Sequence, residues 1–248
     1  MKPILFSTPE VQALLNTKPN AWPAEPIDGE KPHKCQTRRV IKPQPHDVPE
    51  GAYINPYYHN YEHFTVWTHD HKMCLHCGGN IKNTAHWKPQ YQPGDILSVR
   101  ETFFAWGRWA NVIDIKSMKM RKKFFHMTDG EHPYRYCADG LLNTPPAGAI
   151  GYWKLPSIHM PRKAARIFLE VKAVRAERLQ EITTSDAEME GMIAAHMSFW
   201  DFSFARDKFS ALWDFLYAKR GNPWESNPWV WVYEFMRCSY GHSDNSNG

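Results

Sequence analysis

The 248-residue chain lacks the features of a membrane or secreted protein. No stretch approaches the roughly 18 apolar residues that a transmembrane helix needs. The amino terminus has neither a long apolar segment nor a small-residue cleavage site, so we expect no signal peptide. The five cysteines are an odd number and do not fit the disulfide framework of a small secreted domain. We therefore expect a cytoplasmic protein that does not bind membranes.

Several catalytic and repeat signatures are also missing. The chain has no Gly-rich loop of the kind that cradles phosphates, no serine between glycines as in a nucleophile elbow, and no internal repeat. Its charge is nearly balanced, because 30 Lys and Arg against 26 Asp and Glu give a net charge of +4. This mildly basic balance permits a nucleic-acid or nucleotide partner without requiring one.

The composition favours a folded chain with a large core. Hydrophobic residues make up 42% and charged residues 23%, which excludes wholesale disorder. Aromatic residues reach 14%, and most of them belong in the core. A few exposed aromatic rings would be suited to stacking on bases. The length fits one large domain or a small core with insertions.

Short strands and few helices are predicted along the chain. In segment 166–172, Ile167, Leu169 and Val171 alternate with charged residues, which is typical of a half-buried strand. Further strands are predicted at 4–6, 96–100 and 229–235, and helices from Thr8, at 183–191 and at about 202–219. The helix at 183–191 can begin with a capping box formed by Thr183 and Asp186 or by Ser185 and Glu188, and Gly191 marks its end. This pattern predicts an α+β fold built on a small, mostly antiparallel β-barrel with peripheral helices.

We expect one domain over residues 1–238, with long insertions. The insertions are predicted at about 18–32, 46–90 (rich in Cys and His) and 106–135, with a helical insertion at about 193–226. Residues 239–248 are polar and are predicted to form a disordered tail. The insertion at 106–135 shows little periodicity and carries the basic run Lys116, Lys119, Arg121, Lys122 and Lys123. With Phe124 and Phe125 beside it, this run is either a solvated face or a nucleic-acid-binding edge.

Cys74 and Cys77 are candidates for a metal site. Two thiolates at this spacing, followed by Gly78, can hold one side of a tetrahedral zinc ion. The remaining ligands cannot be assigned, since several histidines and two further cysteines are candidates, and free thiols in a loop are the alternative. Both alternatives are favoured over a redox pair, because the cysteines do not open a helix after a strand.

Six segments, in order along the chain, match a known family. They are Pro3-Ile4-Leu5-Phe6-Ser7-Thr8, Lys34-x-Gln36-Thr37-Arg38-Arg39 with Lys42-Pro43, Gly94-Asp95-x-Leu97-x-Val99-Arg100-Glu101-Thr102, Pro156-Ser157-Ile158-His159-Met160-Pro161, Ala187-x-x-Glu190-Gly191, and Asn227-Pro228-Trp229-Val230-Trp231-Val232. In these segments the chain resembles the ASCH-domain proteins of phages and prophages, a branch of the PUA-like superfamily. The resemblance implies a PUA-like barrel with a cleft for a nucleobase or nucleoside.

The resemblance also implies a reaction. One small bacterial ASCH enzyme is a 4-acetylcytidine amidohydrolase that is thought to use a Lys, a Thr and a Glu, which match Lys34, Thr37 and Glu190 here. The chain departs from the family pattern at three places. Pro32 replaces a glycine before the lysine, Cys35 replaces a threonine, and the segment with the cysteine pair is added.

These residues are chemically adequate for removing an acyl group from the exocyclic amine of a cytidine-like base. Thr37 would be the nucleophile and Lys34 its base, since residues three apart in a helical turn project from one face. Glu190, at a helix end and partly buried, would have a raised pKa and serve as the proton donor. Arg38 would stabilise the developing negative charge. No cofactor is needed for this reaction.

Other residues are candidates for contacts with the substrate. Arg38 and Arg39 fit a substrate or phosphate clamp as well as a solvated basic stretch. Arg100 and Glu101 follow a strand and form either a structural ion pair or ligand contacts. Ser157 and His159 lie in a loop flanked by prolines, where His159 is either a structural histidine or a ligand contact.

Two functions remain open on the sequence alone. The first is the ASCH-type amidohydrolase. The alternative is a non-catalytic module that binds RNA, DNA or a modified base through the same cleft. We expect a monomer whose partner is a nucleoside or a nucleic acid, RNA more than DNA.

Overall fold

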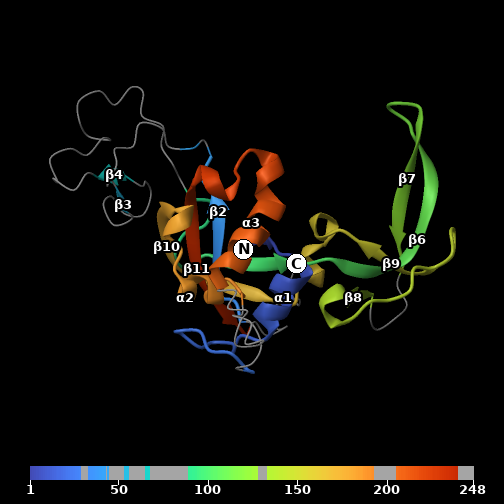
Figure 1. Cartoon of the computed structure of the whole chain (residues 1–248). Coiled ribbons are helices and arrows are strands. Elements are labelled where there is room, and N and C mark those ends of the chain that lie inside the picture. Colours follow the sequence, from blue (N-terminus) through green and yellow to red (C-terminus); the bar gives the residue numbers. More distant parts are fainter. Residues whose placement is uncertain are drawn as a thin grey trace, which may run out of the picture. The chain divides into compact units, whose positions relative to one another are not determined.

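The computed structural model describes residues 1–28, 33–42, 44, 89–127, 133–192 and 205–239, and the backbone of 53–55 and 65–67 (Figure 1). The chain forms two compact units. Unit 1 comprises Met1–Lys2, Ala13–Leu97 and Leu169–Gly248, and unit 2 comprises Pro3–Gln12 and Ser98–Phe168. The expected single domain over 1–238 stays a prediction.

A β-sheet forms the frame of unit 1. Its strands are the first residues of β5 (Ile96–Arg100), then β10 (Phe168–Arg178), β11 (Trp229–Cys238) and β2 (Gln36–Val40), in that order across the sheet. β2 and β11 are antiparallel, with Arg38 opposite Val232 and Thr37 opposite Tyr233. Because side chains alternate along a strand, Arg38 and Thr37 face opposite sides of this sheet. A separate antiparallel pair is formed by β3 (Tyr53–Asn55) and β4 (Thr65–Trp67).

Two helices cover one face of this sheet. α2 (Thr184–Met189) begins at Thr183, whose hydroxyl accepts a hydrogen bond from the backbone N–H of Asp186 while the Asp186 carboxylate accepts from Thr183. This is the capping box predicted for these two residues. α3 (Ala205–Tyr217) packs its apolar stripe on the same core. The buried residues of this core are Leu179, Ile182, Ala187, Ala205, Phe209, Trp213, Val230 and Val232.

Unit 2 is built around the long strand β6 (Phe103–Asp114). It pairs with β9 (Gly151–Leu155) along one edge, and with β8 (Tyr134–Tyr136) and then β7 (Lys119–His126) along the other. Its core contains Phe103, Ala105, Leu155, Met160 and Ala164. Within this unit, β1 (Lys2–Leu5) and β5 are neighbours, and the backbone N–H of Phe6 donates to the carbonyl of Arg100.

The remaining elements are short or lead from one unit into the other. α1 (Thr8–Leu15) begins in unit 2 and ends in unit 1. Single 3-10 turns are found at η2 (Cys137–Asp139), η3 (Ser157–His159), η4 (Arg162–Ala164), η5 (Leu179–Glu181), η6 (Ala218–Arg220) and η7 (Trp224–Ser226). No helix in the part of the chain that the structure describes is long and apolar enough to span a membrane.

The α+β class is confirmed, and the strands pair in open sheets with no closed barrel among the described residues. The strand at 96–100 is confirmed, and Ile167, Leu169 and Val171 are buried as their alternation predicted. The insertion expected at 106–135 stays a prediction, and this segment contains most of the β6–β7 hairpin, which the sequence pattern does not indicate. Beyond Gly107 both faces of this hairpin carry exposed residues, so no half-buried alternation marks it.

The close approach of β6 and β7 at Gly107 should require a residue without a Cβ atom. A Cβ atom there would overlap the carbonyl oxygen of Phe125 and come within 2.8 Å of Phe124 Cζ. We expect Gly107→Ala to lower the free energy of unfolding by about 1–3 kcal/mol, as overpacking does. Asn111→Ala, an exposed change in the same strand, is the control. Urea unfolding of both variants tests this, and equal midpoints for Gly107→Ala and the wild type would contradict it.

Candidate functional site

Lys34 and Glu190, 156 positions apart in the sequence, form a buried ion pair. Lys34 Nζ donates to Glu190 Oε2 at 2.8 Å and to the Glu190 backbone carbonyl at 2.9 Å. Only 1% of the lysine side chain and 4% of the glutamate side chain are exposed. Buried charges are stable only when they are paired and hydrogen-bonded, and this pair meets both conditions.

The local backbone explains why these two side chains meet. Glu190 is the C-terminal capping residue of α2, and Gly191 after it has φ +95°, a left-handed conformation that glycine adopts at little cost. The backbone N–H of Cys35 donates to the Met189 carbonyl at 2.9 Å, which fixes the segment before β2 against the end of α2. The Thr17 hydroxyl accepts from the Lys34 backbone N–H at 3.1 Å. The lysine is therefore held at its backbone and at its ammonium group.

Arg38 supplies the second cation at Glu190. Its Nη1 donates to Glu190 Oε1 at 3.1 Å and to Gln36 Oε1 at 3.3 Å. Its Nε and Nη2 donate to Glu177 Oε1 at 2.9 and 2.6 Å. Arg175 extends the network, since it bonds Glu177, Asp186 and Glu234. Cations and carboxylates thus alternate across the helix-covered face of the sheet.

The two cations decide the ionisation of Glu190. Burial alone would raise the pKa of its carboxyl group, but the charges and hydrogen bonds of Lys34 and Arg38 outweigh burial and lower the pKa below its ordinary value. The expected proton donor is therefore an ionised carboxylate at neutral pH. The prediction of a raised pKa was wrong, because it counted burial and the helix end but not the cations that β2 and the preceding segment bring to this carboxylate.

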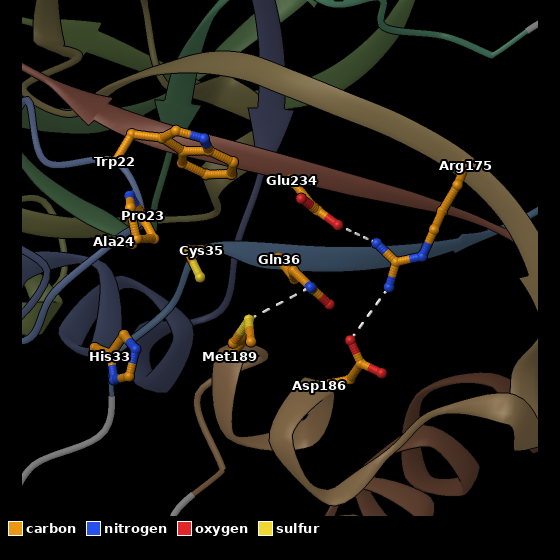
Figure 2. Close-up of a pocket in the computed structure, with 10 residues that line it drawn as sticks. All are labelled: Trp22, Pro23, Ala24, His33, Cys35, Gln36, Arg175, Asp186, Met189 and Glu234. Atoms are coloured by element: carbon orange, nitrogen blue, oxygen red, sulfur yellow. Dashed lines mark hydrogen bonds and ion pairs between the residues drawn. The ribbon is translucent and has the colours of Figure 1, made fainter. Parts of the chain in front are cut away.

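A pocket of about 420 Å³ borders this network (Figure 2). Figure 2 shows Gln36 on β2 and Cys35 just before this strand. The ring of Trp22 lies on one side of them, and Arg175 lies on the other side, between Glu234 and Asp186. The Gln36 Nε2 donates to the Met189 sulfur at 3.5 Å. The lining residues are Trp22, Pro23, Ala24, His33, Cys35, Gln36, Arg175, Asp186, Met189 and Glu234.

The pocket is better equipped for binding than for nucleophilic attack. Burial raises the pKa of the Cys35 thiol to about 12, so the thiolate that would be reactive is not formed at neutral pH. Burial lowers the pKa of His33, although the charge of Glu188 opposes this, so the imidazole is neutral at pH 7. The polar groups that remain are an amide, a guanidinium and two carboxylates, which are groups that fix the orientation of a ligand.

Thr37 lies apart from the ion pair. We predicted a helical turn that would align Thr37 with Lys34. This was wrong, because Gln36–Val40 forms strand β2. Alternation along the strand puts Thr37 on the face opposite Gln36 and Arg38. Its side of the sheet carries Tyr233, which lies opposite it in β11.

The other predicted substrate contacts are dispersed. Arg39 lies in β2, and its Nη1 donates to the hydroxyl of Tyr217, the last residue of α3, at 3.4 Å. Arg100, Glu101, Ser157 and His159 belong to unit 2. There Glu101 pairs with Arg166 at 2.9 Å, so an Arg100–Glu101 pair was the wrong assignment. Arg100 donates to the Ile158 carbonyl at 3.4 Å, and Ser157 and His159 form one 3-10 turn.

Sequence reasoning missed the residues that shape the pocket. Arg175 and Glu177 share one face of β10, but the sequence pattern of charged residues on a strand is the same whether they are solvated or buried in a network. Asp186 is recognisable in the sequence only as a helix cap. No group of His, Cys, Asp and Glu suited to a metal ion occurs within the described ranges, and the candidate zinc ligands Cys74 and Cys77 lie outside them, as do residues 240–248 of the predicted disordered tail.

Comparison of the chain with family models, with curated proteins and with solved structures gives no match.

Removing the Lys34 ammonium should be costly. We expect Lys34→Met to lower the free energy of unfolding by about 3–5 kcal/mol, because it leaves the buried Glu190 with one fewer cation. The double variant Lys34→Met/Glu190→Gln should recover part of this loss. Lys18→Met, which breaks the exposed pair with Glu25, should leave the unfolding midpoint almost unchanged. Equal effects of Lys34→Met and Lys18→Met in urea unfolding would show that the buried pair has no special role.

Acid should weaken the fold through Glu190. A carboxyl whose pKa is lower in the folded than in the unfolded chain stabilises the fold above its unfolded value, and this contribution is lost as the pH falls. We therefore expect the free energy of unfolding to decrease as the pH falls below 4.5. In Glu190→Gln this decrease should be smaller. Urea titrations between pH 3 and pH 7 (about the range where carboxylates protonate) measure both slopes, and identical slopes would refute the assignment.

Proposed function

We propose that the pocket beside the Lys34–Glu190 pair binds a nucleobase or nucleoside. The Gln36 amide carries the proposal, because its Nε2 donates to the thioether sulfur of Met189, which is a weak acceptor. A carbonyl oxygen of a base is a stronger acceptor and would form a more favourable hydrogen bond with this Nε2. The Gln36 Oε1 accepts from Arg38, which fixes the amide with its NH2 group at the pocket. An oriented amide of this kind can read the edge of a base.

The rest of the lining suits the same ligand. The Glu234 and Asp186 carboxylates can accept hydrogen bonds from an exocyclic amine, and the Arg175 guanidinium between them holds both in place. Trp22 is half exposed at the pocket and offers an indole ring for stacking. The volume of about 420 Å³ falls in the range of small-molecule sites.

We place this pocket in an ASCH-type, PUA-like domain that acts as a binding module for a modified base, free or within RNA or DNA. The sequence resemblance supports the family, and the meeting of Lys34 with Glu190 is what that resemblance leads one to expect. Binding without turnover is favoured over hydrolysis for two reasons. Thr37 projects from the other face of β2, and Glu190 is an anion that has no proton to give.

Hydrolysis of a 4-acetylcytidine-type amide is the second candidate. The observation in its favour is the 2.8 Å contact between Lys34 and Glu190, the residues that match two of the three catalytic residues in the similar enzyme. The reaction would require attack on the acyl carbon, cleavage of its bond to the exocyclic nitrogen and transfer of a proton to that nitrogen. It would also require Thr37 to reach the acyl group from the far side of β2, or water to replace it.

Calorimetric titration with cytidine and 4-acetylcytidine tests the binding function. We expect Trp22→Ala to weaken binding by about 5- to 100-fold, the value of one stacked base. Gln36→Ala should weaken it by up to about tenfold, the value of one hydrogen bond. Thr37→Val, on the opposite face, is the control and should bind as the wild type does. Failure of the wild type to bind either nucleoside, or wild-type binding by Gln36→Ala, would refute the proposal.

The same samples decide between the two functions. Chromatography of the titrated 4-acetylcytidine should recover it unchanged, since the proposal is binding without turnover. Release of cytidine that is abolished in a folded Thr37→Val variant would replace the binding function with the hydrolase.

A further inference from the structure

The β6–β7 hairpin continues beyond the rest of its sheet as an arm, here defined as residues 108–125 (Figure 1). Within unit 2, β9 pairs with β6 only as far as Gly107, and β8 only as far as Ala105. From Arg108 to Asp114 the strand pairs with β7 alone among the described residues. At 3.3–3.4 Å per residue the two-stranded part is about 23 Å long.

One face of the arm is cationic. Directly opposed residues share a face, so the register places four exposed basic side chains on it, Arg108, Lys119, Arg121 and Lys123. The same face carries one carboxylate, Asp114, which pairs with Arg121 at 3.2 Å. Lys123 Nζ also lies over the Phe125 ring, 5.6 Å from the ring centroid. The other face carries Lys122 and, near its base, the contact between Trp109 and Phe124 at 5.3 Å.

The turn at the tip of the arm exposes apolar side chains beside the cation Lys116. The Asp114 carboxylate accepts from the Lys116 backbone N–H at 3.1 Å, and the Asp114 carbonyl accepts from the Ser117 N–H at 3.2 Å. This turn presents Ile115, 86% exposed, and Met118, 76% exposed. Ile113 and Met120, opposite each other just before the turn, are also exposed. Clustered apolar side chains at the end of a charged ribbon indicate a surface that a partner covers.

We propose that the arm binds duplex DNA, with its cationic face on the phosphates and its apolar tip wedged into a base step. The two halves of the surface match the two halves of this ligand. Lysine and arginine neutralise phosphates and supply affinity without reading sequence. Isoleucine and methionine are among the side chains that enter between base pairs from the minor groove and bend the duplex. The proposal is independent of the nucleoside pocket, which belongs to unit 1.

The structure favours DNA over duplex RNA. A two-stranded β-ribbon fits the grooves of B-form DNA, whereas the major groove of A-form RNA is too deep and narrow for side chains to read. A wedge also needs a step that unstacks easily, and TA and CA steps of DNA do so. The best ligand should be a duplex with a central TA step rather than a rigid A-tract.

Salt-dependent binding of the full chain to labelled duplexes tests the cationic face. The plot of log affinity against log salt should lose about 0.9 of its slope in Lys123→Ala, and about 1.8 in Lys119→Ala/Lys123→Ala. Lys122→Ala is the matched control, since it removes the same charge from the adjacent residue of the same strand on the opposite face. Its slope should equal that of the wild type. Equal losses for Lys122→Ala and Lys123→Ala would overturn the assignment of the face.

Energy transfer between the duplex ends tests the tip. Ile115→Ser/Met118→Ser should abolish bending of the TA duplex and keep the wild-type salt slope. Tighter binding to duplex RNA of the same sequence, or binding only to anionic vesicles, would overturn the choice of DNA. All these side chains are exposed, so far-UV circular dichroism should be unchanged. Nucleoside titration of the same variants should match the wild type, which separates failure of the arm from failure of the pocket.

Discussion

A carboxylate that is removed from water must be matched by charge, and Glu190 is the point in unit 1 where this constraint acts. Its two oxygens are taken by different cations, Oε2 by Lys34 at 2.8 Å and Oε1 by Arg38 at 3.1 Å. One cation comes from the segment before β2 and the other from β2 itself. The end of α2 therefore has one favourable position against the sheet, because any shift would leave a buried charge without its partner.

The same constraint shapes the pocket. Arg38 is held by Glu190 and Glu177, and it in turn holds the oxygen of the Gln36 amide. Arg175 is held by three carboxylates, of which Asp186 and Glu234 line the pocket. Polar groups fixed in this way lose little freedom when a ligand binds, so the preorganised network lowers the entropic cost of binding. The network thus connects a requirement of folding to the recognition function that we propose.

Local chemistry made part of the fold predictable. The capping box of Thr183 and Asp186 and the glycine stop at 191 depend only on neighbouring residues, and the structure contains both. Strand β2 was not predictable in this way, because Gln36 and Arg38 are buried by a charge network rather than by apolar packing. The helical turn predicted around Thr37 was wrong for that reason. The β6–β7 arm was not predicted for the opposite reason, since both of its faces are exposed beyond Gly107.

The candidate site divides along the same line. The meeting of Lys34 with Glu190 followed from family resemblance alone, because nothing local links positions 156 apart. The lowered pKa of Glu190 could not be predicted before its two cations were placed. Trp22 and Arg175 reach one pocket only through the tertiary fold, and no spacing in the sequence marks them.

A crystal structure of the protein with bound 4-acetylcytidine is the most direct measurement. The account predicts the base in the pocket between Trp22 and Arg175, its carbonyl oxygen accepting from Gln36 Nε2 in place of the Met189 sulfur, its acetyl group intact and the Lys34–Glu190 pair unbroken. A base bound on the other face of β2, against Thr37, or an acyl group transferred to the protein, would contradict it.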